Sequence, residues 1–213
     1  MIPQRESLVV IDFGSQYSRL ITRRVRENQV YCEIIQHTSS WEEVSKLNPK
    51  GIILSGGPAS VYDEDAPLAP AWVYDCGLPV LGICYGMQVM AHQLGGKVAP
   101  SNSREYGHSV VNQNGAGEPL FHGLPTSIPV WMSHADHVTK LPKGFKGVAS
   151  TKGSKFTIIE NEAIKRYGVQ FHPEVTHTEK GILLLKNFVY GICKSKKNWS
   201  TDHQKKTLIK NVQ

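Results

Sequence analysis

A cysteine lies between two glycines where an apolar run meets a helical pattern. The run 80–83 predicts a buried strand, and 85–94 predicts a helix. Gly82 and Gly86 put small residues two positions on either side of Cys84, as a tight strand-to-helix turn around a nucleophile requires. The helix N-terminus would favour the thiolate. The spacing predicts a nucleophile at Cys84, and the alternative is an inert cysteine in a glycine-rich turn.

A histidine and a glutamate follow another apolar run. Residues 167–171 predict a strand, and the sequence continues as His172-Pro173-Glu174. Side chains two apart in an extended segment point the same way. His172 could therefore act as a general base for Cys84, with the Glu174 carboxylate fixing its tautomer. A surface histidine is the alternative.

A third glycine-rich turn, 55–58 (SGGP), follows the apolar run 52–54. Such a loop can direct backbone N–H groups at an anion, and the N–H groups of Gly57 and Tyr85 could together form an oxyanion hole. The sequence contains neither G-x-x-x-x-G-K-[ST] nor G-x-G-x-x-G, which argues against a phosphate-binding loop.

The remaining cysteines and histidines do not indicate a metal site. The four cysteines form no C-x-x-C pair, which argues against a disulfide framework and against paired metal thiolates. His134 and His137 have no thiolate or carboxylate partners at metal-ligand spacing. No metal is expected.

These motifs require a sheet to position them. Strands are expected at 8–11, 30–35, 51–54 and 80–83, alternating with helices at 17–27, 41–47, 68–76 and 85–94. Short strands at 108–111, 128–132, 148–150, 156–160 and 167–171 precede a helix at 180–193. The pattern predicts an α/β fold with an open, mostly parallel central sheet, helices on both faces and antiparallel additions.

The positive charge is concentrated at the end of the sequence. Of the net charge of +6 over 213 residues, 194–213 carry +5. A body this close to neutral does not resemble a nucleic-acid binder. We expect one domain at 1–193 and a basic linker at 194–213. The sequence has no apolar run long enough to span a membrane and no signal peptide, so a cytoplasmic protein is expected.

Together, the segments 55–58 (SGGP), 82–88 (GICYGMQ) and 171–174 (FHPE) resemble the class I glutamine amidotransferase family in order and spacing. The resemblance covers 7–193 and implies a flavodoxin-like fold. The segments 12–17 (DFGSQY), 23–27 (RRVRE) and 104–107 (REYG) resemble the branch of the family whose ammonia aminates XMP to GMP.

This resemblance implies that the chain hydrolyses glutamine to glutamate and ammonia. Cys84 would form a glutamyl thioester, His172 would be the general acid and base, and Glu174 would orient it. The implied oxyanion N–H groups belong to Gly57 and Tyr85. The α-amino and carboxylate groups of glutamine would be held by Gln88 and a loop containing Ser133, His134 and Asp136. The family more often has glycine at the position of Ala135.

The resemblance also implies a partner for the ammonia. It would pass to an ATP-pyrophosphatase domain, in the same longer protein or in a separate subunit. The nucleotide loop of that domain, Ser-Gly-Gly-x-Asp-Ser, does not occur in this sequence. ATP and Mg²⁺ are therefore expected only in the partner domain, and no cofactor, nucleic acid or membrane is expected to bind this chain. The polar segment 101–106, with Arg104 and Glu105, is a candidate docking loop.

Three alternatives remain open. The chain could be the glutaminase of another pathway, such as anthranilate or carbamoyl phosphate synthesis. It could be a catalytically silent regulatory domain, although the intact Cys84, His172 and Glu174 argue against that. It could also be a cysteine peptidase or γ-glutamyl hydrolase of the same fold.

Overall fold

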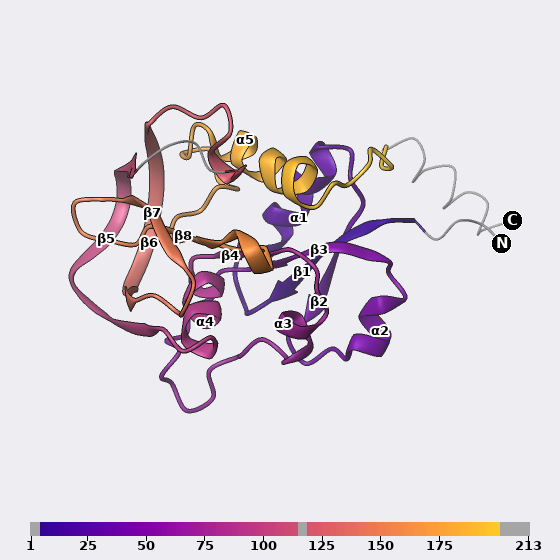
Figure 1. The fold of residues 1–213 in the computed structure, drawn as a ribbon, viewed down its shortest axis with the longest axis horizontal. Coiled ribbons are helices and arrows are strands. Elements are labelled where there is room, and N and C mark those ends of the chain that lie inside the picture. The colour runs from indigo at the N-terminus through magenta and orange to yellow at the C-terminus, as the bar shows by residue number, and fades with distance from the viewer. Residues whose placement is uncertain (1–4, 115–118, 201–213) are drawn as a thin grey trace, which may run out of the picture.

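The computed structural model describes residues 5–114 and 119–200, with side chains at 101–104 outside the description (Figure 1). The first half contains β1 (Ser7–Asp12), α1 (Ser18–Glu27), β2 (Cys32–Gln36), α2 (Trp41–Ser45), β3 (Pro49–Leu54), α3 (Trp72–Asp75), β4 (Val80–Ile83) and α4 (Tyr85–Gln93). The second half contains β5 (Lys97–Gln113), β6 (Ser127–Lys140), β7 (Lys146–Ser150), β8 (Ile158–Asn161), β9 (Arg166–Val169) and α5 (Gly181–Lys186). Within the expected linker 194–213, residues 201–213 lie outside the described residues.

One sheet runs through the molecule in the order β2-β1-β3-β4-β9-β8-β7-β5-β6. The five strands from β2 to β9 pair in parallel, and the remaining pairs are antiparallel. The predicted fold class is therefore confirmed. Because the carboxyl ends of parallel strands share one edge, the residues after β3, β4 and β9 can meet there.

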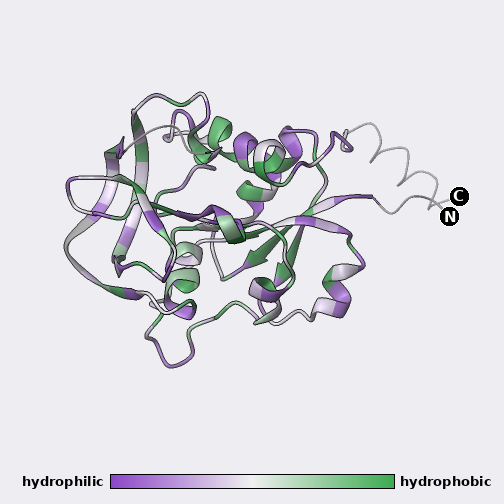
Figure 2. Ribbon diagram, viewed as in Figure 1, coloured by the Kyte–Doolittle hydropathy of each residue, from purple (hydrophilic) through white to green (hydrophobic). Residues whose placement is uncertain are grey.

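Each face of the parallel strands has its own apolar core. Ile53 of β3 joins the core under α1 and α5, whereas its neighbours Ile52 and Leu54 join the core under α3 and α4. This alternation follows from the two-residue period of a strand. Figure 2 shows the central strands as mainly hydrophobic, between helices on both sides. Burial on both faces explains why these strands are near-continuous apolar runs in the sequence.

The antiparallel region is a long hairpin, not the short strands expected at 108–111 and 128–132. β5 and β6 pair from Lys97↔Lys140 to Asn112↔Ser127, with a register shift between Pro100 and Glu105. The shift and the positive φ of Gly107 (+90°) let the strand bend without ending the ladder. Consequently the segments 101–106 and 133–136, both expected as loops, lie within strands.

Two predicted helices differ in length or form. The helix expected at 68–76 is only α3, because Pro70 disfavours helical backbone at the residue before it. The helix expected at 180–193 begins as α5 and continues at Asn187–Ile192 with the wider π-helical turn. Leu184, Leu185, Phe188 and Val189 are buried, whereas Ile182 is exposed.

The turn between β4 and α4 leaves no room for side chains on its two glycines. A Cβ on Gly82 would lie 2.6 Å from the backbone nitrogen of Met87 and 2.7 Å from the carbonyl oxygen of Gly86. A Cβ on Gly86 would collide with the backbone of Leu54 in β3. Cys84, between them, has a φ of 52° and a ψ of −108°. Left-handed φ is strained for a residue other than glycine, as in a nucleophile elbow.

This close approach predicts different outcomes for two helical glycines. Gly86→Ala should destabilise the protein by at least about 1–3 kcal/mol, because α4 would have to move away from β3. Gly191→Ala is the matched control, since no atom lies within 4 Å of its added Cβ. It should be neutral or stabilising by up to about 1 kcal/mol. Urea unfolding measures both, and equal stabilities would contradict the packing argument.

Candidate active site

Two of the three glycine- or histidine-containing motifs, 55–58 and 82–88, line one cavity of about 320 Å³ at the carboxyl edge of the parallel strands, whereas His172 and Glu174 are not among its lining residues. Its lining includes seven predicted residues: Gly57, Cys84, Tyr85, Gln88, Ser133, His134 and Asp136. They come from the loop after β3, from the β4–α4 turn, from the first turn of α4 and from β6. Ala135, Pro58, Ala59, Ser60 and Tyr106 complete the wall. A cavity of this size can hold a small amino acid.

Cys84 projects from the strained turn into this cavity. Its thiol is 3.7 Å from the carbonyl oxygen of Ser133, to which it can donate, and the amide of Gln170 approaches Sγ at 3.8 Å. Its backbone N–H donates to the carbonyl oxygen of Val169 at 2.7 Å. The turn is therefore tied to β9, the strand from which His172 follows.

His172 and Glu174 form the predicted pair. Nδ1 of His172 donates to Oε1 of Glu174 at 2.8 Å, so Nε2 is the nitrogen left for Cys84. Glu174 has no solvent exposure, and His172 is 4% exposed. Burial acts to lower the pKa of His172, but hydrogen bonds to Cys84 and Glu174 outweigh burial and raise the pKa to about 10. The ring is thus an imidazolium at neutral pH, beside the nucleophile.

Backbone hydrogen bonds fix the segment that carries the pair. The N–H of His172 donates to the carbonyl oxygen of Trp131 in β6, at 3.2 Å. The hydroxyl of Thr178 donates to the carbonyl oxygen of His172 at 2.7 Å and accepts from the N–H of Trp131 at 3.1 Å. The catalytic strand end is therefore attached to the hairpin that forms the opposite wall.

Gly56 and Gly57 bring the loop after β3 against the pair and the turn. A Cβ on Gly56 would lie 3.2 Å from Cε1 of His172 and 3.9 Å from Cβ of Cys84. A Cβ on Gly57 would lie 3.0 Å from Cδ1 of Tyr85. Tyr85 is the first residue of α4, a position whose N–H has no partner within a helix. The loop thus lies where the oxyanion assignment of Gly57 and Tyr85 needs it.

The residues assigned to glutamine are joined by their own hydrogen bonds. The side-chain amide of Gln88 donates to the carbonyl oxygen of Asp136 at 2.7 Å, and Nδ1 of His134 donates to the same oxygen at 3.0 Å. Oδ2 of Asp136 accepts from the hydroxyl of Ser60 at 2.6 Å. Burial lowers the pKa of His134, although Glu105 acts in the opposite direction. The group forms a polar wall that a substrate could engage.

Some residues of the site were not found from the sequence. Gln170, whose amide also lies 3.4 Å from that of Gln88, precedes His172 by two positions, so strand periodicity could have indicated it. Ser60 had no local signature, and Tyr106 was noted only within the segment 104–107, because long-range folding brings both to the cavity. Glu105, proposed from the sequence as a docking residue, accepts from the hydroxyl of Thr151 at 3.0 Å and lies 3.4 Å from Nε2 of His134, so its carboxylate has partners within the domain. The side chain of Arg104 lies outside the described residues.

Neither a metal cluster nor a membrane span is found in the described ranges. No group of three or more His, Cys, Asp or Glu side chains there is arranged to hold a metal ion. No helix there is long and apolar enough to cross a membrane.

With this geometry in view, comparison with known proteins identifies the family. The sequence model of the family "Glutamine amidotransferase class-I" matches residues 9–192. The chain therefore belongs to the class I glutamine amidotransferase family.

Curated relatives refine the comparison. A GMP synthase [glutamine-hydrolyzing] from Dehalococcoides mccartyi is 51% identical over 98% of this chain, which spans 39% of that protein. The protein of the same name from Aquifex aeolicus is 52% identical over 92% of this chain and 38% of its own length. This chain thus spans about two fifths of the length of these relatives.

Solved structures agree with the fold. A Thermoplasma acidophilum protein, provisionally described as a subunit of GMP synthase, has a TM-score of 0.82 and 32% identity, covering 89% of this chain and 94% of its own. A Thermotoga maritima glutamine amidotransferase has a TM-score of 0.69 at 19% identity, covering 90% of this chain and 99% of its own. At that identity the second structure supports the fold alone.

The His172–Glu174 hydrogen bond predicts a pKa that depends on the carboxylate. Glu174→Gln should lower the pKa of His172 from about 10 toward 6.5, because the neutral amide can still accept from Nδ1 but no longer stabilises the ring's charge. Titration of the His172 ring by nitrogen-15 NMR measures the change. Glu179→Gln, at an exposed position on the same segment, is the control and should leave the pKa unchanged.

The same shift sets a pH window for stability. Folding raises the pKa of His172, so protonation of this ring stabilises the folded state. That stabilisation is fully present below about pH 6.5 and is lost as the pH rises toward 10. The free energy of unfolding should therefore fall across this window in the wild type, and fall less in Glu174→Gln. Parallel pH profiles for the two proteins would contradict the assignment.

Proposed function

We propose that the chain hydrolyses glutamine to glutamate and ammonia through a thioester on Cys84. The observation that carries the proposal is a strained cysteine, at a helix N-terminus and facing a cavity, beside a buried, hydrogen-bonded histidine–glutamate pair. The family membership supports the same chemistry.

In the first step, the Cys84 thiolate attacks the side-chain amide carbon of glutamine. The N–H groups of Gly57 and Tyr85 would stabilise the developing oxyanion. The imidazolium of His172 gives its proton to the leaving nitrogen, the carbon–nitrogen bond breaks, and ammonia and the thioester form. Glu174 keeps Nδ1 protonated throughout, so that proton transfer runs through Nε2.

In the second step, the neutral His172 takes a proton from water, and the resulting hydroxide attacks the thioester carbon. The sulfur–carbon bond breaks, glutamate leaves and the thiolate–imidazolium pair is restored. The polar wall of Gln88, Ser133, His134 and Asp136 would bind the α-amino and carboxylate groups of the substrate. Two easier steps thereby replace one difficult amide hydrolysis.

We further propose that the ammonia serves amination of XMP to GMP by an ATP-pyrophosphatase domain. The name of the relatives at about 50% identity, GMP synthase [glutamine-hydrolyzing], supports this acceptor over the anthranilate or carbamoyl phosphate pathways. This domain would lie either in the same longer polypeptide or in a separate subunit, and the relatives offer a counterpart of each arrangement. The Dehalococcoides protein is much longer than this chain, whereas the Thermoplasma chain is matched over nearly its full length. ATP and Mg²⁺ would bind the partner domain.

The nucleophile can be tested by covalent labelling. A diazoketone analogue of glutamine should attach once, at Cys84, and Cys84→Ala should abolish both labelling and glutamate production. Burial raises the pKa of Cys32 to about 12 and raises that of Cys193 still further, so neither should react. Cys76→Ala is the control at a partly exposed cysteine and should label normally. Peptide mapping that finds the label elsewhere would overturn the assignment.

The partner can be tested in trans. The part of the Dehalococcoides protein that this chain does not match, supplied with ATP, Mg²⁺ and XMP, should raise glutamate production and yield GMP. Coupling of the two reactions avoids wasted ammonia, which is the reason to expect stimulation. Cys84→Ala with the same additions is the control and should make GMP only from added ammonium salt. An unchanged glutamine turnover would argue for an autonomous glutaminase.

A further inference from the structure

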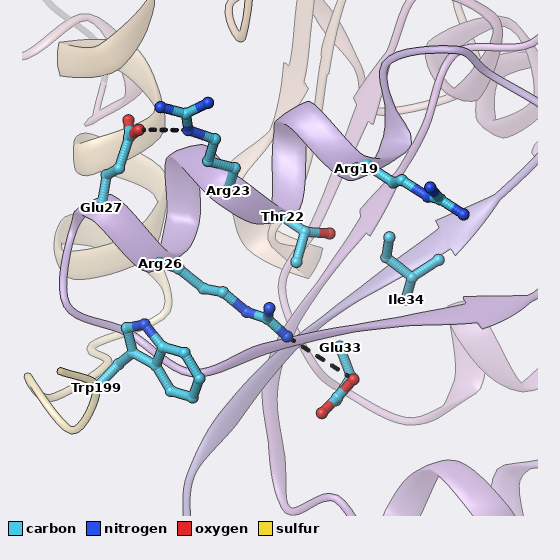
Figure 3. Close-up of a pocket in the computed structure, with 8 residues that line it drawn as sticks. All are labelled: Arg19, Thr22, Arg23, Arg26, Glu27, Glu33, Ile34 and Trp199. Carbon is cyan, nitrogen blue, oxygen red and sulfur yellow. Dashed lines mark hydrogen bonds and ion pairs between the residues drawn. The ribbon is translucent and has the colours of Figure 1, made fainter. Parts of the chain in front are cut away.

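A second depression, of about 520 Å³, lies along α1 at the edge strand β2 and shares no lining residue with the catalytic cavity. Figure 3 shows Arg26 of α1 directed toward Glu33 of β2, with the ring of Trp199 close to Arg26. Trp199 belongs to the segment that follows the last helix, so this depression marks where the C-terminal segment meets the body of the domain.

Asn198 and Trp199, here called the C-terminal anchor, are bonded to three separate parts of the chain. Their N–H groups donate to the carbonyl oxygen of Gln29, at 2.8 Å and 2.9 Å. The Asn198 side chain accepts from the N–H of Tyr31 at 2.9 Å and donates to the carbonyl oxygen of Glu6 at 2.7 Å. The anchor thus joins the end of α1, the approach to β2 and the approach to β1.

The indole ring strengthens this attachment. It packs 5.3 Å from the ring of Tyr31, with the guanidinium of Arg26 4.9 Å and that of Arg5 5.1 Å from its centroid. Arg5 also donates to the carbonyl oxygen of Asn198. Cations over an indole face are attracted by its quadrupole. Because Arg26 is on the last turn of α1, the ring holds that end of the helix directly.

Helix α1 also contacts two members of the proposed triad. Nε of Arg24 donates to the carbonyl oxygen of Glu174 at 2.9 Å, while its Nη1 pairs with Glu27 at 2.8 Å. Tyr17, the N-cap residue, packs edge-on against the ring of His172, with centroids 5.1 Å apart. One helix thus connects the C-terminal anchor to the base and its orienter.

We propose that the C-terminal anchor fixes the position of α1, and that α1, through Arg24 and Tyr17, positions Glu174 and His172 for catalysis. This inference rests on the proposed glutaminase function. Arg24 is then a positioning residue, because it touches the backbone of Glu174 and not the substrate cavity.

The rigidity of α1 makes the connection effective. A ten-residue helix is about 15 Å long and moves as a unit, and Ile21 and Val25 are fully buried beneath it. A displacement at Gln29 or Arg26 would therefore reach Arg24 within one turn. Any protein part joined after Trp199 would act on this anchor, which gives a route by which a following domain could alter glutamine hydrolysis.

The test compares two tryptophans in the full chain. Trp199→Ala should lower kcat for glutamine about tenfold, as expected for a slightly misplaced catalytic group, with KM little changed because the polar wall lies on other elements. The pKa of His172, followed by NMR, should fall as well. Trp199→Phe, which keeps an aromatic ring, should have the wild-type kcat and the wild-type pKa of His172. Trp41→Ala, which removes a similarly packed ring on α2, should leave both unchanged.

Arg24→Met tests the same connection at the end nearer His172 and Glu174. It also keeps the test decisive if the Trp199 variant misfolds. It should also lower kcat and the pKa of His172, and the double variant should lose less than the product of the single losses. Wild-type kcat and pKa in either folded single variant would overturn the inference. Failure of the proposed function itself is distinct, because it would appear as no glutamate production by the wild type or as undiminished production by Cys84→Ala.

Discussion

The close contact between α4 and the strands β3 and β4 is the constraint on which the rest of the site depends. With glycine at 82 and 86, the chain passes from strand to helix through the single residue Cys84, which has a positive φ. The strain is retained because β4 is held between two parallel neighbours and because Cys84 is bonded through its N–H to β9. A looser turn would let the thiol rotate away from His172.

The electrostatics of the site follow from the same arrangement. Because β9 neighbours β4, the residues that follow it reach Cys84 without a long loop, and the carboxylate of Glu174 is carried into a buried position. A buried carboxylate needs a charged or hydrogen-bonded partner, and the protonated ring of His172 supplies it. The hydrogen bonds to Cys84 and Glu174 therefore raise the pKa of His172 before any substrate is present.

The sequence predicted those features that are specified locally. Apolar runs predicted the parallel strands, and paired glycines around Cys84 predicted the turn, because both depend on a few adjacent residues. The length of the β5–β6 hairpin was missed since Gly107 resembles a strand breaker, whereas its ladder depends on pairing across the whole hairpin. The sequence placed Glu105 in a polar docking loop, and its contact with His134 depends on the pairing of β5 with β6. Arg24 and Glu174 are 150 positions apart, so no local pattern could connect them.

The C-terminal anchor and Cys84 lie at opposite ends of the parallel strands. Asn198 is bonded next to the beginning of β1, whereas Cys84 follows the end of β4, and strands of this kind are about 15–20 Å long. About one strand length of packed sheet therefore separates the anchor from the thiol. The ten residues of α1 are about 15 Å long, so this helix spans the distance between the two ends of the sheet. An attachment at one end of the sheet is thus mechanically connected to the pair of His172 and Glu174 at the other through a single element.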